Sequence, residues 1–141
     1  MSNLPLVSIC IPSYNGAKYI IEAMDSAINQ TYKKLEIVVS DDASRDDTLK
    51  IIESFKEKTD IPIFIHHHLP NGIGANWNNS VKKAKGDYIK FLFQDDVLMP
   101  TCIERMVDLA IKNKNVGLVY CKREIIYNPE IIFDVNWVKK F

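Results

Sequence analysis

Short runs rich in valine, isoleucine and aromatic residues alternate with segments of helical periodicity along nearly the whole chain. The runs predict five strands, at residues 6–11, 35–40, 61–66, 88–93 and 116–121. The segments between them predict four helices, at residues 18–29, about 44–58, about 75–85 and from 100 onward. Such alternation predicts an α/β fold with a mainly parallel sheet, helices on both faces and right-handed crossovers.

Local signals mark the ends of several predicted helices. Ser44, with Asp47 three residues later, is a capping arrangement that predicts a helix start. Pro100 favours the first turn of the last helix, because its fixed φ suits that position. Gly86 follows the third helix, and its missing side chain suits a left-handed cap.

Size and charge exclude several classes of protein. A chain of 141 residues with 47% hydrophobic residues fits one domain with one core. Eighteen basic residues balance eighteen acidic ones, so no global field attracts nucleic acid or an anionic membrane. No apolar run approaches the roughly 20 residues that span a bilayer, and the first residues lack a secretion signal. We therefore expect no nucleic-acid partner and no membrane span.

The three cysteines, Cys10, Cys102 and Cys121, lie far apart inside apolar runs. Their odd number and spacing predict reduced, buried thiols in a cytoplasmic protein rather than disulfides or a metal cluster.

Acidic pairs follow two of the predicted strands. Asp41 and Asp42 come after the second strand, and Asp95 and Asp96 after the fourth. Ligands of open α/β sheets bind beyond the carboxyl ends of the strands, so both pairs fall on the binding edge. With few nearby cations the carboxylates would repel one another, and Mg²⁺ or Mn²⁺ would relieve this while bridging diphosphate oxygens. The alternative is that these acids cap helices or stay solvated in turns.

The loop after the first strand adds a flat ring, Tyr14, on which a base could stack. Asp42 could accept the imino proton of uracil or thymine. The alternative for Tyr14 is a half-buried aromatic residue of a turn.

Several blocks of the sequence together resemble the family two inverting glycosyltransferases. Residues 7–15, 26–32 and 36–44 resemble the opening blocks, and residues 71–74, 77–78, 86–89 and 94–96 match later blocks in the same order. The resemblance covers about residues 6–120. It implies a Rossmann-like GT-A domain that binds a cytosolic nucleoside diphosphate sugar, with a role in cell-envelope polysaccharide biosynthesis.

The resemblance also implies roles for individual residues. Asp96 would bind the metal, and the following residues would contact the nucleotide: Pro12, Tyr14, Asn15, Asp41, Asp42 and Asp95. Two departures from the family pattern stand out. The usual Asp-x-Asp reads Gln94-Asp95-Asp96, and a block that often reads Ala-Arg-Asn is Asn76-Trp77-Asn78, which lacks the cation.

The resemblance also predicts the division of the chain and its activity. We expect a nucleotide-sugar-binding domain at residues 1–121, and residues 122–141 as the start of a missing or truncated acceptor-binding part. The predicted reaction is inverting transfer from a UDP- or dTDP-sugar to the hydroxyl of a saccharide or lipid-linked acceptor. Such a reaction needs a general base in line with the anomeric carbon. Glu124 and Glu130 lie in the tail, and we expect both to be solvated surface acids.

Two other functions are alternatives to a glycosyltransferase. A catalytically incomplete nucleotide-sugar-binding module would bind the donor without transferring sugar. A phosphoacceptor receiver domain shares the α/β alternation but carries its acidic pair after the first strand, where this chain has residues 12–15.

Three further motifs are interpreted as structural. His66, His67 and His68 cannot all face one ion, because adjacent strand residues point to opposite faces. We expect at least one of them to be buried in the sheet or hydrogen-bonded at the strand end. Gly72 and Gly74 begin a phosphate-binding glycine fingerprint that no further glycine completes. The helical spacing of Trp77 from Val81 and Ala84 predicts a core residue.

Overall fold

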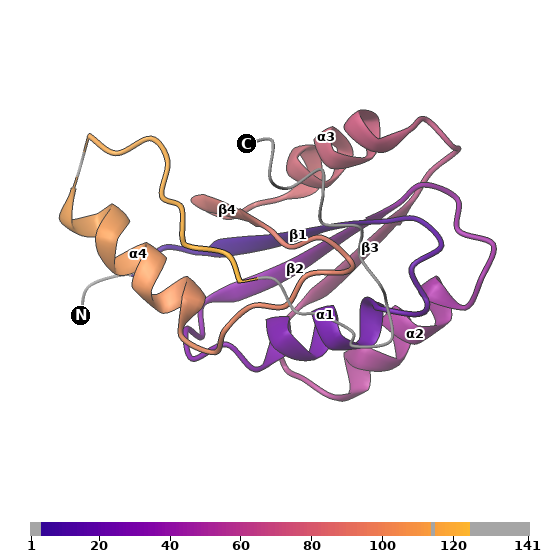
Figure 1. Ribbon diagram of the computed structural model, residues 1–141, viewed down its shortest axis with the longest axis horizontal. Helices are drawn as coiled ribbons and strands as arrows, with labels where there is room; N and C mark the ends of the chain where they lie inside the picture. Colours follow the sequence, from indigo (N-terminus) through magenta and orange to yellow (C-terminus); the bar gives the residue numbers. More distant parts are fainter. Residues whose placement is uncertain (1–3, 114, 125–141) are drawn as a thin grey trace, which may run out of the picture.

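The computed structural model describes residues 4–113 and 115–124, and it has the predicted α/β architecture. Four parallel strands form one sheet in the order β3-β2-β1-β4. The strands are β1 (Val7–Ser13), β2 (Leu35–Asp41), β3 (Ile63–His67) and β4 (Tyr88–Phe91). The helices are α1 (Ile20–Ile28), α2 (Thr48–Ser54) with the 3-10 turn η1 (Phe55–Glu57), α3 (Ile73–Lys83) and α4 (Cys102–Lys112). Figure 1 shows α3 on one side of the sheet and α1 and α2 on the other.

The two central strands carry the core. Every residue of β1 and β2 is buried, because each strand has a neighbour on both edges and helices on both faces. Alternate side chains such as Ile9 and Ile37 pack with Met24 of α1 and Ile52 of α2 in one apolar cluster. Leu92, Ile103 and Val107 extend this cluster to the N-terminal half of α4.

The opposite face of the sheet packs on α3 through polar groups. Ser8 donates a hydrogen bond to Glu36 Oε1 (2.5 Å), and the backbone N–H of Lys85 donates to the same oxygen (2.6 Å). The buried residues of α3 are Asn76 and Ser80. Within the described residues, no buried side-chain nitrogen or oxygen lacks a hydrogen-bond partner, so this polar face does not carry unsatisfied groups.

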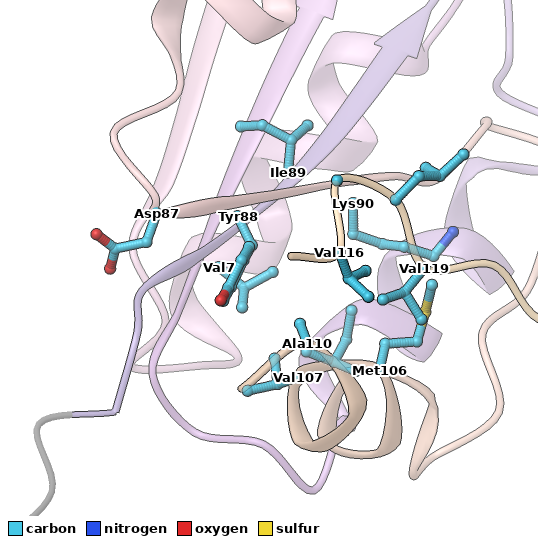
Figure 2. Close-up of a pocket in the computed structure, with 13 residues that line it drawn as sticks. Val7, Asp87, Tyr88, Ile89, Lys90, Met106, Val107, Ala110, Val116 and Val119 are labelled. Carbon is cyan, nitrogen blue, oxygen red and sulfur yellow. The ribbon is translucent and has the colours of Figure 1, made fainter. Parts of the chain in front are cut away.

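The predicted fifth strand is wrong. Residues 116–121 form neither strand nor helix, and the side chains of Leu118 and Tyr120 are 80% and 86% exposed. Instead of pairing with β4, the segment forms one wall of a cavity of about 320 Å³ between β4 and α4. Figure 2 shows Val116 and Val119 beside Met106 and Ala110 of α4. Val116 and Val119 therefore line a cavity together with α4, while the backbone of the segment has no strand partner.

Three predicted helix signals are also wrong, and one of them is Pro100, which precedes the Thr101 cap of α4 and lies outside its first turn. Helix α2 begins at Thr48, not near Ser44, and Asp47 makes no side-chain capping bond. The hydroxyl of Ser44 instead donates to Asp41 Oδ1 (2.5 Å). Gly86 is not a left-handed cap, since Gly72 is the glycine with positive φ (81°). A β-carbon on Gly86 would lie 2.6 Å from the backbone nitrogen of Ser8, so close approach to β1 explains this glycine.

The remaining strand and helix limits fall within two residues of the predicted ones. Residues 122–141 are the predicted start of an acceptor-binding part. The structure describes residues 122–124 of this range, and they are exposed. No helix in the described ranges is long and apolar enough to cross a bilayer.

The cysteines do not share one environment, contrary to the prediction. Cys10 is buried in β1, and its burial raises the pKa of the thiol to about 11. Cys102 is half-buried and Cys121 is exposed, so only one of the three thiols is enclosed in the core.

Candidate nucleotide-sugar site

The loops that follow the four strands meet at one edge of the sheet. This is a consequence of the parallel arrangement, which brings all carboxyl ends to the same edge. Hydrogen bonds link these loops to one another, and they run between residues distant in the sequence. The edge is therefore one connected surface rather than four separate turns.

Gln94 joins the loop after β4 to the loop after β1. The backbone N–H of Tyr14 donates to Gln94 Oε1 (2.9 Å), and Gln94 Nε2 donates to the carbonyl oxygen of Tyr14 (3.1 Å). The same amide fills the space above Gly16, where a β-carbon would lie 2.3 Å from Oε1. A carboxylate in place of the amide could not donate. The departure from Asp-x-Asp thus has a structural role that sequence reasoning missed.

Asp41 lies beneath this surface. Its carboxylate accepts hydrogen bonds from the hydroxyls of Ser13 (2.9 Å) and Ser44 (2.5 Å) and from the backbone N–H of Ser44 (2.8 Å). The ring Nδ1 of His67 lies 3.2 Å from its other oxygen. The residue is 0% exposed, which argues against the predicted direct contact with a nucleotide. Asp41 instead fixes the loops around it.

Asp42 connects β2 to the loop that begins α3. Its two carboxylate oxygens accept the backbone N–H groups of Asn71 (2.7 Å) and Gly72 (3.0 Å). Its own N–H donates to the carbonyl oxygen of Ser13 (3.0 Å). The residue is 7% exposed. Because a carboxylate offers about four lone-pair sites, Asp42 retains acceptor capacity for a base.

His68 stands beside Asp42, with its Nδ1 3.5 Å from the Asp42 carboxylate. Its ring also contacts the carbonyl oxygen of Leu69 (2.8 Å) and Asn76 Oδ1 (3.1 Å). The Leu69 carbonyl, followed by Asn76 and the nearby aspartates, raises the pKa of His68 above 6.5 against the opposing effect of burial. The predicted hydrogen bonding of histidines at the strand end is confirmed for His67 and His68.

The loop after β1 presents the predicted ring to solvent. Tyr14 is 52% exposed, whereas Pro12 is buried as the penultimate residue of β1. Asn15 is exposed with a positive φ of 45°, and its side-chain oxygen accepts the backbone N–H of Arg45 (2.8 Å). The position of Tyr14 therefore suits stacking on a base, while Pro12 supports the loop from below.

Asp95 and Asp96 follow β4 on the same edge. Asp95 is exposed, and the Asp96 side chain is 37% exposed. Nη2 of Arg123 lies 2.9 Å and 3.2 Å from the two carboxylate oxygens of Asp96. The expectation that few cations lie near these acids is thus wrong for Asp96. The pairing was not evident from the sequence, because Arg123 lies 27 residues further along the chain.

The metal-binding capacity of this edge is small. In the described part of the chain, no group of three histidine, cysteine, aspartate or glutamate side chains is arranged to hold an ion. Asp95 and Asp96 could supply at most two carboxylates. That number fits Mg²⁺ or Mn²⁺ sites in which substrate phosphates and water complete the coordination.

The structure describes Trp77 and Glu124 but not Glu130. Trp77 packs against Phe93, with ring centroids 4.8 Å apart, but remains 37% exposed, so the predicted core position is only partly right. Glu124 is exposed, as expected. Glu130 lies outside the described residues.

Comparison with known proteins gives the family. The sequence matches glycosyl transferase family 2 over residues 8–136. It is 44% identical over 124 residues to an uncharacterized glycosyltransferase of Rickettsia typhi, a match that covers 86% of this chain and 37% of that protein. The family match excludes the receiver-domain alternative.

Two solved structures share the fold. S. aureus TarS, residues 1–349 in complex with UDP-GlcNAc, aligns with a TM-score of 0.71 at 29% identity over 76% of this chain and 31% of that chain. A mannosyltransferase from Pyrobaculum calidifontis in complex with GDP-Man and Mn²⁺ aligns with a TM-score of 0.64 at 28% identity over 68% and 29% of the two chains. This chain therefore spans between 29% and 37% of these proteins. The predicted GT-A nucleotide-binding fold is confirmed, and the chain belongs to glycosyl transferase family 2.

Proposed function

We propose that the loop edge binds the nucleoside diphosphate part of a sugar donor, a UDP- or dTDP-sugar. The observation that carries this proposal is the hydrogen-bonded connection of the loops, in which Gln94 ties the acidic turn after β4 to Tyr14. Tyr14 would stack on the base, and Asp42 would accept its imino proton. TarS, a structure in complex with UDP-GlcNAc, supports a uridine donor.

The remaining roles follow from exposure. Asp95 is accessible to the ribose or diphosphate, and Asn15 lies on the same loop as Tyr14. Pro12 and Asp41 are buried, so both would act on the nucleotide by holding the loops that contact it. Substitution of Pro12 or Asp41 would therefore weaken nucleotide binding by changing the positions of the loops.

Asp96 would hold a divalent metal, Mg²⁺ or Mn²⁺. A bound cation neutralises the charge that develops on a departing nucleoside diphosphate. The half-exposed carboxylate already attracts a cationic group, the guanidinium of Arg123, which supports its suitability for a cation. The mannosyltransferase in complex with Mn²⁺ is a further indication. The cytoplasmic location, predicted from the cysteines and from a cytosolic sugar donor, stays a prediction.

We expect this domain to take part in inverting transfer of the sugar to an acceptor hydroxyl. The acceptor, a saccharide or a lipid-linked group, and a role in cell-envelope polysaccharide biosynthesis remain predictions. A catalytically incomplete binding module is the second candidate, because no residue is assigned as the general base and Glu124, in the described part of the tail, is exposed. Donor hydrolysis or sugar transfer by this chain would exclude the second candidate.

The donor site can be tested by calorimetric titration with UDP, dTDP and GDP, each with and without Mn²⁺. We expect UDP or dTDP to bind with Mn²⁺, and Asp96→Asn to remove the metal-dependent part of the affinity. Asp108→Asn on the exposed side of α4 is the charge-matched control. Absence of nucleotide binding, or wild-type affinity in Asp96→Asn, would refute the site assignment, and a preference for GDP would correct the base.

A further inference from the structure

The contact between Arg123 and Asp96 places a permanently charged guanidinium beside the proposed metal ligand. One guanidinium nitrogen reaches both carboxylate oxygens, at 2.9 Å and 3.2 Å. The backbone N–H of Asp96 donates to the carbonyl oxygen of Phe93 (3.0 Å), so a turn holds the backbone of Asp96 in place. The two residues come from different segments: the turn after β4 and the segment after α4.

Arg123 belongs to a segment that is not fixed by regular structure. Residues 118–124 form no helix or strand, and the Arg123 side chain is 76% exposed. Exposed ion pairs contribute at most about 1 kcal/mol, because water screens the charges and both side chains lose conformational freedom. Arg123 can therefore leave Asp96 at small cost.

A metal ion and the guanidinium would compete for the two carboxylate oxygens of Asp96. Both are cationic, and at the close distance set by a shared carboxylate they repel each other. Direct coordination of a divalent ion by Asp96 thus favours movement of Arg123 away from the carboxylate. When no metal is bound, the guanidinium neutralises Asp96.

We propose that Arg123 is a tethered counter-ion that competes with the divalent metal for Asp96. The proposal rests on the function proposed above, since it assumes that Asp96 binds the metal. Arg123 acts here as a positioning residue. It holds the carboxylate when no metal is bound and lowers the affinity of the site for the free ion. Metal binding would in turn release the side chain of Arg123 from Asp96.

The test is the affinity for Mn²⁺, measured by the loss of the free-ion signal in electron paramagnetic resonance, with and without UDP. We expect Arg123→Gln to bind Mn²⁺ about two- to fivefold more tightly than wild type, the range given by an exposed ion pair. Arg123→Lys, which keeps the charge, should stay closer to wild type. Arg105→Gln removes the same charge from an exposed position of α4 and should have no effect.

The outcomes separate this inference from the function on which it rests. If Arg123→Gln binds Mn²⁺ no more tightly than wild type, or if Arg105→Gln gains the same affinity, Arg123 is not a competing counter-ion. Either result leaves the proposed metal site unaffected. No Mn²⁺ binding by wild type or Arg123→Gln in either condition overturns both. Arg123→Ala serves as a second charge-removing variant, and it must show the same direction of change as Arg123→Gln.

Discussion

The side-chain amide of Gln94 and the main chain of Tyr14 form a reciprocal pair of hydrogen bonds, 2.9 Å and 3.1 Å long, across 80 residues of sequence. The pair needs a group that both donates and accepts, which an amide provides and a carboxylate does not. It sets the position of the exposed tyrosine ring relative to Asp95 and Asp96. A residue that departs from the family pattern thus helps to shape the proposed site.

We expect Gln94→Glu to weaken this connection. The new carboxylate would face the carbonyl oxygen of Tyr14 without a proton to donate, at a cost of about 1–2 kcal/mol. Urea unfolding should report this loss, and nucleotide affinity should fall with it. Asn78→Asp, on an exposed position of α3, is the control for the added charge. Equal unfolding free energies for Gln94→Glu and Asn78→Asp would contradict the assigned role.

Asp41→Asn is expected to destabilise the fold more strongly. The change places an amide N–H₂ among groups that donate to the carboxylate, namely the Ser13 and Ser44 hydroxyls and the Ser44 N–H. Hydrogen bonds to a charged acceptor contribute about 1.5–3 kcal/mol, so we expect a loss of at least about 2 kcal/mol in unfolding free energy. Asp47→Asn is the matched control, since Asp47 is exposed and its side chain makes no capping hydrogen bond at the start of α2. A similarly small effect of both changes would show that the buried carboxylate is dispensable.

Two glycine-to-alanine changes should have opposite effects. In Gly86→Ala the new methyl group would lie 2.6 Å from the Ser8 nitrogen, which forces β1 and β4 apart and costs about 1–3 kcal/mol. In Gly74→Ala nothing lies within 4 Å of the new group, and a helical alanine is about 1 kcal/mol more favourable than glycine. Thermal unfolding should therefore show a lower Tm for Gly86→Ala and a higher Tm for Gly74→Ala. The same sign for both variants would refute the close-approach explanation.

The neighbouring histidines should titrate in different ranges. The Leu69 carbonyl raises the pKa of His68 above 6.5, whereas burial lowers the pKa of His66 below it. Because the folded-state pKa of His68 is raised, its stabilising contribution is complete below pH 6.5 and is lost as pH rises through the folded-state value. The wild type should therefore lose stability relative to His68→Gln as the pH rises from 6.5 through the folded-state pKa of His68. Histidine NMR titration gives the order of the two pKa values directly, and a reversed order would contradict this account.

The sequence alone determined the α/β alternation, the parallel strands and the edge on which Asp42 and Asp96 lie. These features depend on local periodicity and on the residues that follow each strand, and both can be read along the chain. The family blocks were likewise evident, because they are short continuous segments. The prediction of a fifth strand was wrong because an apolar run of this length predicts burial but does not show which strand it would pair with.

Only the tertiary structure decided what each acidic side chain contacts. Asp41 and Asp42 are adjacent in sequence, yet one carboxylate is enclosed by Ser13, Ser44 and His67 while the other holds the loop at Asn71 and Gly72. The pairing of Arg123 with Asp96 joins residues from separate segments in the same way. Such contacts depend on how the loops fold back over the sheet, and no periodic pattern encodes them. The parallel strands determine which loops lie at the carboxyl edge of the sheet. Long-range hydrogen bonds and ion pairs then determine the position of each side chain there.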